Sequence, residues 1–139
     1  ISWAAPSDFT NRMEQSKLET WKTKGVAYVF NSRTQQNMPL YYQFYLDCIN
    51  NHKRFNIKNA VTSLSKPLFI VHGTKDPTVL ITDAYDFKKW NNNTVIHEIN
   101  DANHVFGVMH PYDLENYPND FKDAIQATLN FLKTQSSIS

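Results

Sequence analysis

The clearest strand in the sequence lies within Pro67-Leu68-Phe69-Ile70-Val71-His72-Gly73-Thr74-Lys75-Asp76. An unbroken apolar run follows the proline, and a run of this kind is typical of a parallel strand buried on both faces. A glycine and an acid come soon after the run ends. The stretch therefore predicts a core strand over 68–71, with Asp76 in the loop at its carboxyl end.

A second strand and loop follow the same plan. The strand is expected over Thr94–Ile99, and its loop reads Asn100-Asp101-Ala102-Asn103-His104-Val105-Phe106-Gly107. An amphipathic helix over 79–90 fits between the two strands, which makes them parallel neighbours. Because the carboxyl ends of parallel strands share one edge of a sheet, we expect Asp76 and His104 to come within hydrogen-bonding reach.

The rest of the chain predicts an α/β fold of three parallel strands flanked by helices. We expect one domain over 1–139, in which 8–65 is a mainly helical, cap-like excursion and 66–139 carries the acid and histidine segments. The further elements expected are a strand over 1–5, one or two short helices over 7–25, a β-type segment over 26–30, a polar loop over 31–37, helices over 40–49 (begun by Pro39), 57–64 and 119–133.

Composition excludes several classes of protein. The net charge of +1 gives no electrostatic case for a nucleic acid or an anionic membrane as partner. No apolar run approaches the roughly 20 residues of a membrane helix. The single Cys48 excludes an internal disulfide framework and favours a reducing compartment such as the cytoplasm. Its aromatic helical surroundings predict a buried, unreactive thiol.

Acid and histidine are two members of a nucleophilic triad. A serine hydroxyl needs a base to remove its proton, imidazole can do so near neutral pH, and a carboxylate orients the imidazole. The turn Gly-x-Ser-x-Gly that would carry the serine is missing, because none of the glycines flanks a serine at that spacing. The chain also starts at Ile1 in what reads as a strand in progress, so we expect a truncated or cleaved product.

These two segments resemble the acid and histidine segments of α/β-hydrolases, especially the dienelactone-hydrolase-like and prolyl-oligopeptidase-like branch, where His-Gly-x-x-Asp-x-x-Val recurs. The opening Ile-Ser-Trp-Ala-Ala-Pro-Ser-Asp-Phe resembles the strand after the nucleophile helix. The resemblance implies strands six to eight of an eight-stranded sheet. It further implies the carboxyl half of a serine hydrolase for a small ester, thioester or peptide substrate, without a cofactor. Asp76 would orient His104, the general base. The nucleophile turn and oxyanion loop have no counterpart.

Structural interpretations compete for several residues. Asp76 could cap a helix beginning near Thr78, Asp101 looks like a turn residue, and His72 is expected to have a satisfied structural role. A metal site is the third alternative, but its candidate ligands match no compact motif, and we expect none. Those ligands would be His72, His97, His104 and His110.

The excursion and the first strand lead to weaker expectations. Arg33, Tyr41 and Tyr42 could orient a substrate carboxylate or carbonyl, although a salt bridge and aromatic packing explain them better. The strand over 1–5 would leave a bare sheet edge, which predicts a homodimer paired through it. The chain alone should be inactive. The alternative from another class is a non-catalytic interaction module with the same fold.

Overall fold

The computed structural model describes residues 1–8, 15–31, 34–109, 111–112 and 115–136. The chain divides into two compact units. The expectation of one domain over 1–139, with an excursion over 8–65, stays a prediction. We call Ile1–Ser7 with Lys58–Ser139 the sheet unit, and Asp8–Ile57 the inserted unit.

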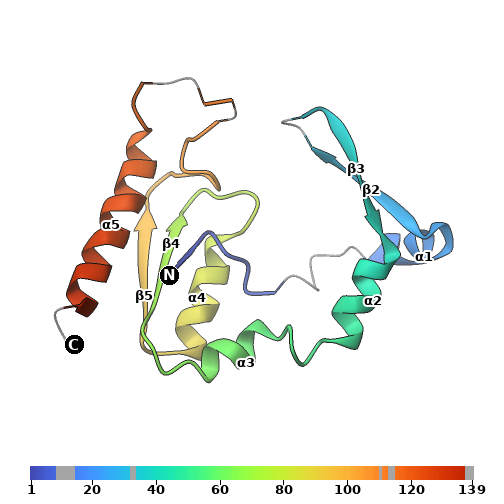
Figure 1. Cartoon of the computed structure of the whole chain (residues 1–139), viewed down its shortest axis with the longest axis horizontal. Coiled ribbons are helices and arrows are strands. Elements are labelled where there is room, and N and C mark those ends of the chain that lie inside the picture. The colour runs from blue at the N-terminus through green and yellow to red at the C-terminus, as the bar shows by residue number, and fades with distance from the viewer. Residues whose placement is uncertain (9–14, 32–33, 110, 113–114, 137–139) are drawn as a thin grey trace. The chain divides into compact units, whose positions relative to one another are not determined.

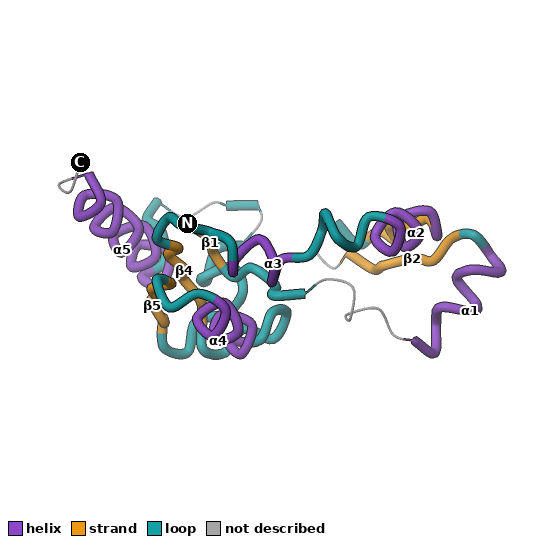
Figure 2. The backbone as a smooth tube through the Cα atoms, turned by 90° about the horizontal axis from the view of Figure 1, so that it is seen from below, coloured by secondary structure: helices purple, strands orange, loops and turns teal. Residues whose placement is uncertain are grey.

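A parallel sheet of three strands organises the sheet unit, as predicted (Figures 1 and 2). Its order is β1 (Ser2–Trp3), β4 (Leu68–Gly73), β5 (Thr94–Ile99). Both pairings are parallel, with Trp3 opposite Val71 and Val71 opposite His97. The loops that follow β4 and β5 therefore leave from the same edge of the sheet.

The central strand β4 is buried because helices cover both faces. Phe69, Ile70 and Val71 are 5%, 0% and 0% exposed, as a continuous apolar run in a parallel sheet requires. Helix α5 (Asn119–Ser136) lies against one face, and α4 (Ile81–Trp90) lies on the other (Figures 1 and 2). The strand thus serves as the hydrophobic centre of the unit.

Aromatic contacts fix α5 against the sheet. Phe131 stacks on Phe69 with ring centroids 4.6 Å apart. Trp3 meets Phe106 and Phe121 edge to face, each at 5.7 Å, and its indole Nε1 donates a 3.0 Å hydrogen bond to Thr128 Oγ1. Edge-to-face pairs add specific attraction to the burial of apolar area. These contacts join β1, α5 and the loop after β5 into one core.

Helix α3 (Ile57–Thr62) leads into β4 and is tied to the end of α4. The buried Asn91 side chain donates from Nδ2 to the carbonyl oxygens of Val61, at 3.1 Å, and Leu64, at 3.0 Å. This anchoring joins the segment that follows Lys58 to the rest of the sheet unit.

The inserted unit contains α1 (Gln15–Lys24), β2 (Val26–Asn31), β3 (Gln36–Tyr41) and α2 (Tyr42–Asn50). Gly25 ends α1 as predicted, since its φ of +71° suits glycine at a helix C-terminus. The two strands pair as an antiparallel hairpin, so the β-type segment expected over 26–30 is confirmed as one hairpin arm.

The second arm of the hairpin corrects the sequence prediction. Strand β3 takes up the last two residues of the polar loop expected over 31–37, Gln36 and Asn37, together with the start of the helix expected from Pro39. Pro39 pairs opposite Tyr28 in this two-stranded sheet. A proline is tolerated in an edge strand because its missing N–H can face outward. The helix instead begins at Tyr42, and the excursion is not purely helical.

An aromatic cluster forms the core of the inserted unit. Trp21 is buried, donates from Nε1 to the Leu40 carbonyl oxygen at 2.8 Å, and packs edge to face on Tyr42. Cys48 is also buried, and burial first, with the Asp47 charge second, raises the pKa of its thiol. A raised pKa keeps the thiol protonated, which agrees with the unreactive cysteine predicted.

Strand β1 stands at one edge of the described sheet, with β4 as its neighbour. Pairing of two copies through this edge stays a prediction. In the described part of the chain, no helix combines the length and the apolar character needed to cross a membrane.

Candidate active site

The acid loop follows β4 and is built around Asp76. This residue is 3% exposed. Its Oδ1 accepts hydrogen bonds from the backbone N–H groups of Thr78, at 2.8 Å, and Val79, at 2.9 Å. Helix α4 begins later, at Ile81, so the expected helix cap is in fact a cap of the turn before the helix.

The other carboxylate oxygen of Asp76 binds His104. The imidazole Nδ1 donates to Oδ2 over 2.8 Å, a charge-assisted distance. Nδ1 must carry the hydrogen because the ionised carboxylate can only accept. In the neutral ring Nε2 is therefore bare, and no described residue hydrogen-bonds to it. The predicted approach of the two side chains is found, with a base nitrogen left available.

The surroundings of Asp76 favour its ionised form. Burial alone would raise the pKa of this carboxyl, since a low dielectric disfavours charge. The N–H of Val79, the His104 ring and the N–H of Thr78 all stabilise the anion, and together they hold the pKa of Asp76 below its usual value. The carboxylate is thus charged at neutral pH and can stabilise a histidine cation.

Backbone contacts lock the acid loop to the histidine loop. A Cβ atom placed on Gly73 would lie 2.7 Å from the Ala102 carbonyl carbon and closer still to its oxygen. The same carbonyl accepts a 3.1 Å hydrogen bond from Lys75 N–H, while Thr74 N–H donates to the Ile99 carbonyl at 3.0 Å. Glycine is needed here because two backbones touch.

The histidine loop is also shaped by its own residues. Asn103 Oδ1 accepts from the N–H groups of Val105, at 3.1 Å, and Gly107, at 3.0 Å. A short amide side chain can close such a turn in place of a backbone group. Phe106 is 3% exposed and enters the core beside Trp3. His104 therefore lies between the turn closed by Asn103 and the buried side chain of Phe106.

Asp101 is the acid that the sequence offered as a competitor. Its φ of +59° places it in the left-handed region typical of turns. Its carboxylate, 61% exposed, pairs with Lys75 Nζ at 2.8 Å. The interpretation of Asp101 as a turn residue is confirmed.

His72 departs from expectation, because only one of its nitrogens is satisfied. The side chain is completely buried, and Nε2 contacts the Val79 carbonyl oxygen at 2.9 Å. Nδ1 is buried with no hydrogen-bond partner in the described part of the chain. Sequence alone could not reveal this, since the missing partner depends on which groups fold around the ring.

The residues expected to orient a substrate belong to the inserted unit. Arg33 lies outside the described residues. Tyr41 is 64% exposed, whereas Tyr42 packs between Trp21 and Tyr45. These contacts of Tyr42 lie within the inserted unit, whereas we expected the aromatic residues to pack the excursion onto the sheet. A role in substrate binding stays a prediction for all three expected residues.

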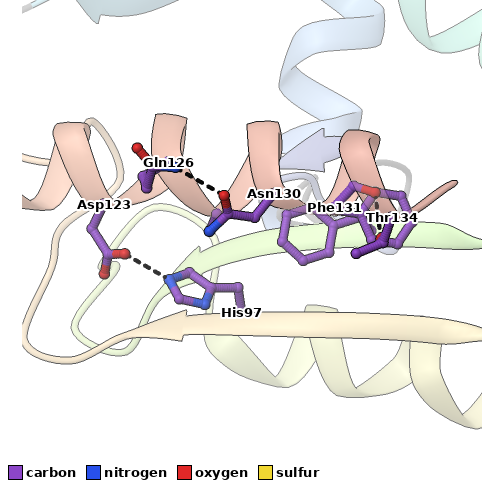
Figure 3. A pocket seen from close by; sticks show the side chains of 8 residues that line it. His97, Asp123, Gln126, Asn130, Phe131 and Thr134 are labelled. Atoms are coloured by element: carbon purple, nitrogen blue, oxygen red, sulfur yellow. Dashed lines mark hydrogen bonds and ion pairs between the residues drawn. The ribbon is translucent and has the colours of Figure 1, made fainter. Parts of the chain in front are cut away.

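A second His–Asp pair, which sequence analysis missed, lies between β5 and α5. His97 Nε2 and Asp123 Oδ1 are 3.0 Å apart (Figure 3). They border a groove of about 360 Å³ with Phe69, Ala127 and Phe131 among its apolar lining. Histidine on a strand and aspartate on a distant helix carry no local signal for this contact.

The metal alternative gains no support from the described residues. No three His, Cys, Asp or Glu side chains there gather closely enough to hold an ion. His72 is in the core and His97 is in the groove, while His110 lies outside the described residues.

Several solved structures resemble this chain, among them the following two. Est1E from Butyrivibrio proteoclasticus aligns over 96% of this chain and 45% of its own, with a TM-score of 0.60 and 14% identity. The esterase domain of a Rhodothermus marinus protein aligns over 77% of this chain and 43% of its own, with a TM-score of 0.48 and 14% identity. Neither a protein-family model nor a curated protein sequence matches the chain.

The likeness to Est1E shows the fold. Together with the parallel sheet and its flanking helices, it defines an α/β fold that matches part of the α/β-hydrolase fold. This chain spans less than half the length of either solved chain.

Proposed function

We propose that this chain is the acid- and histidine-bearing part of a serine hydrolase that cleaves an ester, thioester or peptide bond. One observation carries the proposal, namely the 2.8 Å hydrogen bond from His104 Nδ1 to a buried carboxylate that two backbone N–H groups also hold. A surface ion pair has no need of such a carboxylate. An orienting acid needs it, since the histidine must be presented in one tautomer.

In the proposed reaction, the serine comes from sequence upstream of this chain. His104 Nε2 takes the serine hydroxyl proton as the oxygen attacks the substrate carbonyl, and Asp76 stabilises the resulting imidazolium. The proton then passes to the leaving group, which departs and leaves an acyl-serine. Water attacks this acyl group and gives its proton to Nε2, and the serine oxygen recovers that proton as the acid product leaves. The proposal requires neither cofactor nor metal.

The test extends the reading frame upstream and asks for a Gly-x-Ser-x-Gly turn. The longer protein is then treated with a fluorophosphonate probe, which modifies only activated serines. We expect labelling of that serine in the parent protein and a large loss of labelling rate in Asp76→Asn. The amide cannot orient His104 in the required tautomer.

Asp101→Asn is the matched control. It makes the same chemical change in the neighbouring loop, and asparagine tolerates the positive φ of this position. Labelling should be unchanged in this variant. An upstream sequence without a serine turn, or labelling that ignores Asp76→Asn, would contradict the proposal and favour a non-catalytic interaction module.

The 139-residue chain by itself provides a second check. It should show no specific fluorophosphonate labelling, because the serine and its oxyanion donors are expected upstream. Specific labelling of any serine in this chain that depends on His104 would mean that the nucleophile has been misplaced.

A further inference from the structure

The buried His72 ring connects the end of strand β4 to the turn at Val79, on the far side of the acid loop. It sits at the end of β4, and its Nε2 lies 2.9 Å from the Val79 carbonyl oxygen. A carbonyl only accepts, so Nε2 carries the hydrogen and Nδ1 of the neutral ring is bare. The same Nε2 lies 3.5 Å from Asp76 Oδ2, which is the oxygen that binds His104.

Keeping a histidine at this position has a cost. Its Nδ1 is buried without a hydrogen-bond partner among the described residues. An unsatisfied buried polar atom destabilises the fold, and a phenylalanine or leucine would avoid this cost in a strand that is otherwise apolar. Core packing alone therefore does not explain why a histidine is present. Its Nε2–H group, however, makes a specific hydrogen bond to the Val79 carbonyl oxygen.

The backbone of Val79 is held from both sides. Its N–H donates to Asp76 Oδ1 at 2.9 Å, and its carbonyl accepts from His72. The N–H and the carbonyl belong to the two peptide planes on either side of the Val79 Cα. The two hydrogen bonds together therefore restrain the Val79 backbone, including the N–H that binds the carboxylate. The N–H edge of His72 also faces the region of Oδ2 at a distance that is attractive but too long for a good hydrogen bond.

We propose that His72 is a positioning residue for the Asp76–His104 pair. It braces the acid loop through Val79 so that the carboxylate presents Oδ2 to His104 Nδ1. This inference rests on the proposed function, since it assigns His72 to the same site. His72 itself would touch neither substrate nor serine.

The test uses the 139-residue chain and nuclear magnetic resonance. The probe is the low-field signal of the His104 Nδ1–H proton, which reports its bond to Asp76. His72→Phe keeps a flat ring in the core but removes the N–H, so we expect loss of this signal and faster hydrogen exchange at Val79 N–H. His72→Gln retains an N–H donor and should retain the signal.

A merely structural role would give a different pattern. The methyl signals of Ile70 and Val71 report whether β4 is still packed, and we expect them to persist in His72→Phe. His97→Phe makes the same substitution on β5 and should leave the His104 signal intact. A signal that survives unchanged in a folded His72→Phe, or that is lost in a folded His72→Gln, would overturn the inference.

Two further outcomes are also decisive. If His72→Phe does not fold, the test compares His72→Gln with the wild-type chain. Retention of the His104 Nδ1–H signal and of slow exchange at Val79 N–H in His72→Gln supports the positioning role of His72. Absence of the signal from the wild-type chain would overturn the Asp76–His104 pair, and with it both the proposed function and this inference. Overturning His72 alone leaves the proposed function standing.

Discussion

The two His–Asp pairs of the sheet unit have nearly equal bond lengths but differ in construction. His104 and Asp76 are 2.8 Å apart, and His97 and Asp123 are 3.0 Å apart. The Asp76 side chain is fully buried and is held by two backbone N–H groups as well. The Asp123 side chain is 49% exposed, and His97 is its hydrogen-bond partner in the described chain. Distance alone therefore does not identify a site.

The two pairs differ in whether backbone N–H groups also bind the carboxylate. Burying a carboxylate is costly unless hydrogen bonds compensate it, and the acid loop supplies those bonds before any substrate arrives. An exposed pair keeps water as an alternative partner, so its geometry is weakly enforced. The backbone therefore holds the Asp76–His104 pair in one geometry, while the His97–Asp123 pair is an ordinary surface contact.

The largest expected difference between the pairs is catalytic. In the longer serine hydrolase that we propose, His104→Ala should lower kcat/KM by about 10⁴-fold or more, as loss of a triad base does. His97→Ala should leave kcat/KM nearly unchanged, because that ring lies against α5. Steady-state hydrolysis of an activated ester measures both. Comparable losses of kcat/KM in the two variants would show that the two His–Asp pairs do not differ in catalytic importance.

Asp76→Asn should also destabilise the fold of the 139-residue chain. The new amide keeps only one oxygen. Its N–H₂ group would face either the backbone N–H donors of Thr78 and Val79, which it cannot satisfy, or His104 Nδ1, which must then lose its hydrogen to accept. A buried unsatisfied group costs about 1–3 kcal/mol, which urea unfolding at neutral pH can resolve. A variant as stable as wild type would mean that the acid loop relaxes without loss.

Gly73→Ala tests the backbone contact that brings the two loops together. The added methyl would clash with the Ala102 carbonyl, and forcing extra volume into a packed site costs about 1–3 kcal/mol. We expect a lower urea midpoint and a weakened His104 Nδ1–H signal. Gly25→Ala serves as a control, since it strains a positive φ in open space and should spare that signal.

Stability should fall in acid in a way that depends on Asp76. Because its folded-state pKa is lowered, the carboxylate stabilises the fold above the ordinary carboxyl range, near pH 4. That contribution is lost as the pH drops through the folded-state pKa, at up to about 1.4 kcal/mol per pH unit for one proton. Between neutral and acid pH, the unfolding free energy should fall less steeply with decreasing pH in Asp76→Asn than in the wild-type chain. Identical slopes would contradict the lowered pKa.

The smallest effect is expected at the exposed pair. Asp123→Asn should change the unfolding free energy by less than about 1 kcal/mol, the usual range for surface ion pairs. It repeats the substitution made at Asp76, so the same urea titration compares them directly. A loss as large as that of Asp76→Asn would show that exposure is a poor guide to the strength of these pairs.

The sequence predicts the sheet unit well because its signals are local. The apolar run of β4 and the order of acid and histidine loops require only short stretches of chain, and parallel pairing then brings Asp76 and His104 together. The helix over 119–133 likewise follows from its apolar spacing. In these cases local preference and tertiary structure agree.

The remaining features depend on contacts between distant residues. Strand β3 was missed because Gln36 and Asn37 look like a loop, and only pairing with β2 makes Pro39 part of a strand. The role of Gly73 depends on the Ala102 carbonyl, and the half-satisfied state of His72 depends on Val79 and on the absence of a described partner. No periodicity or motif encodes these relations.

The close approach of Gly73 to Ala102 also limits how such a chain can diversify. Because the two backbones are in contact, a residue inserted into either loop would displace the other loop. The lengths of the two loops are therefore constrained together. The inserted unit carries no such restriction from this contact, because its 50-residue span, Asp8–Ile57, lies elsewhere in the sequence. We therefore expect natural variation in length to accumulate there, while the two loops keep their lengths.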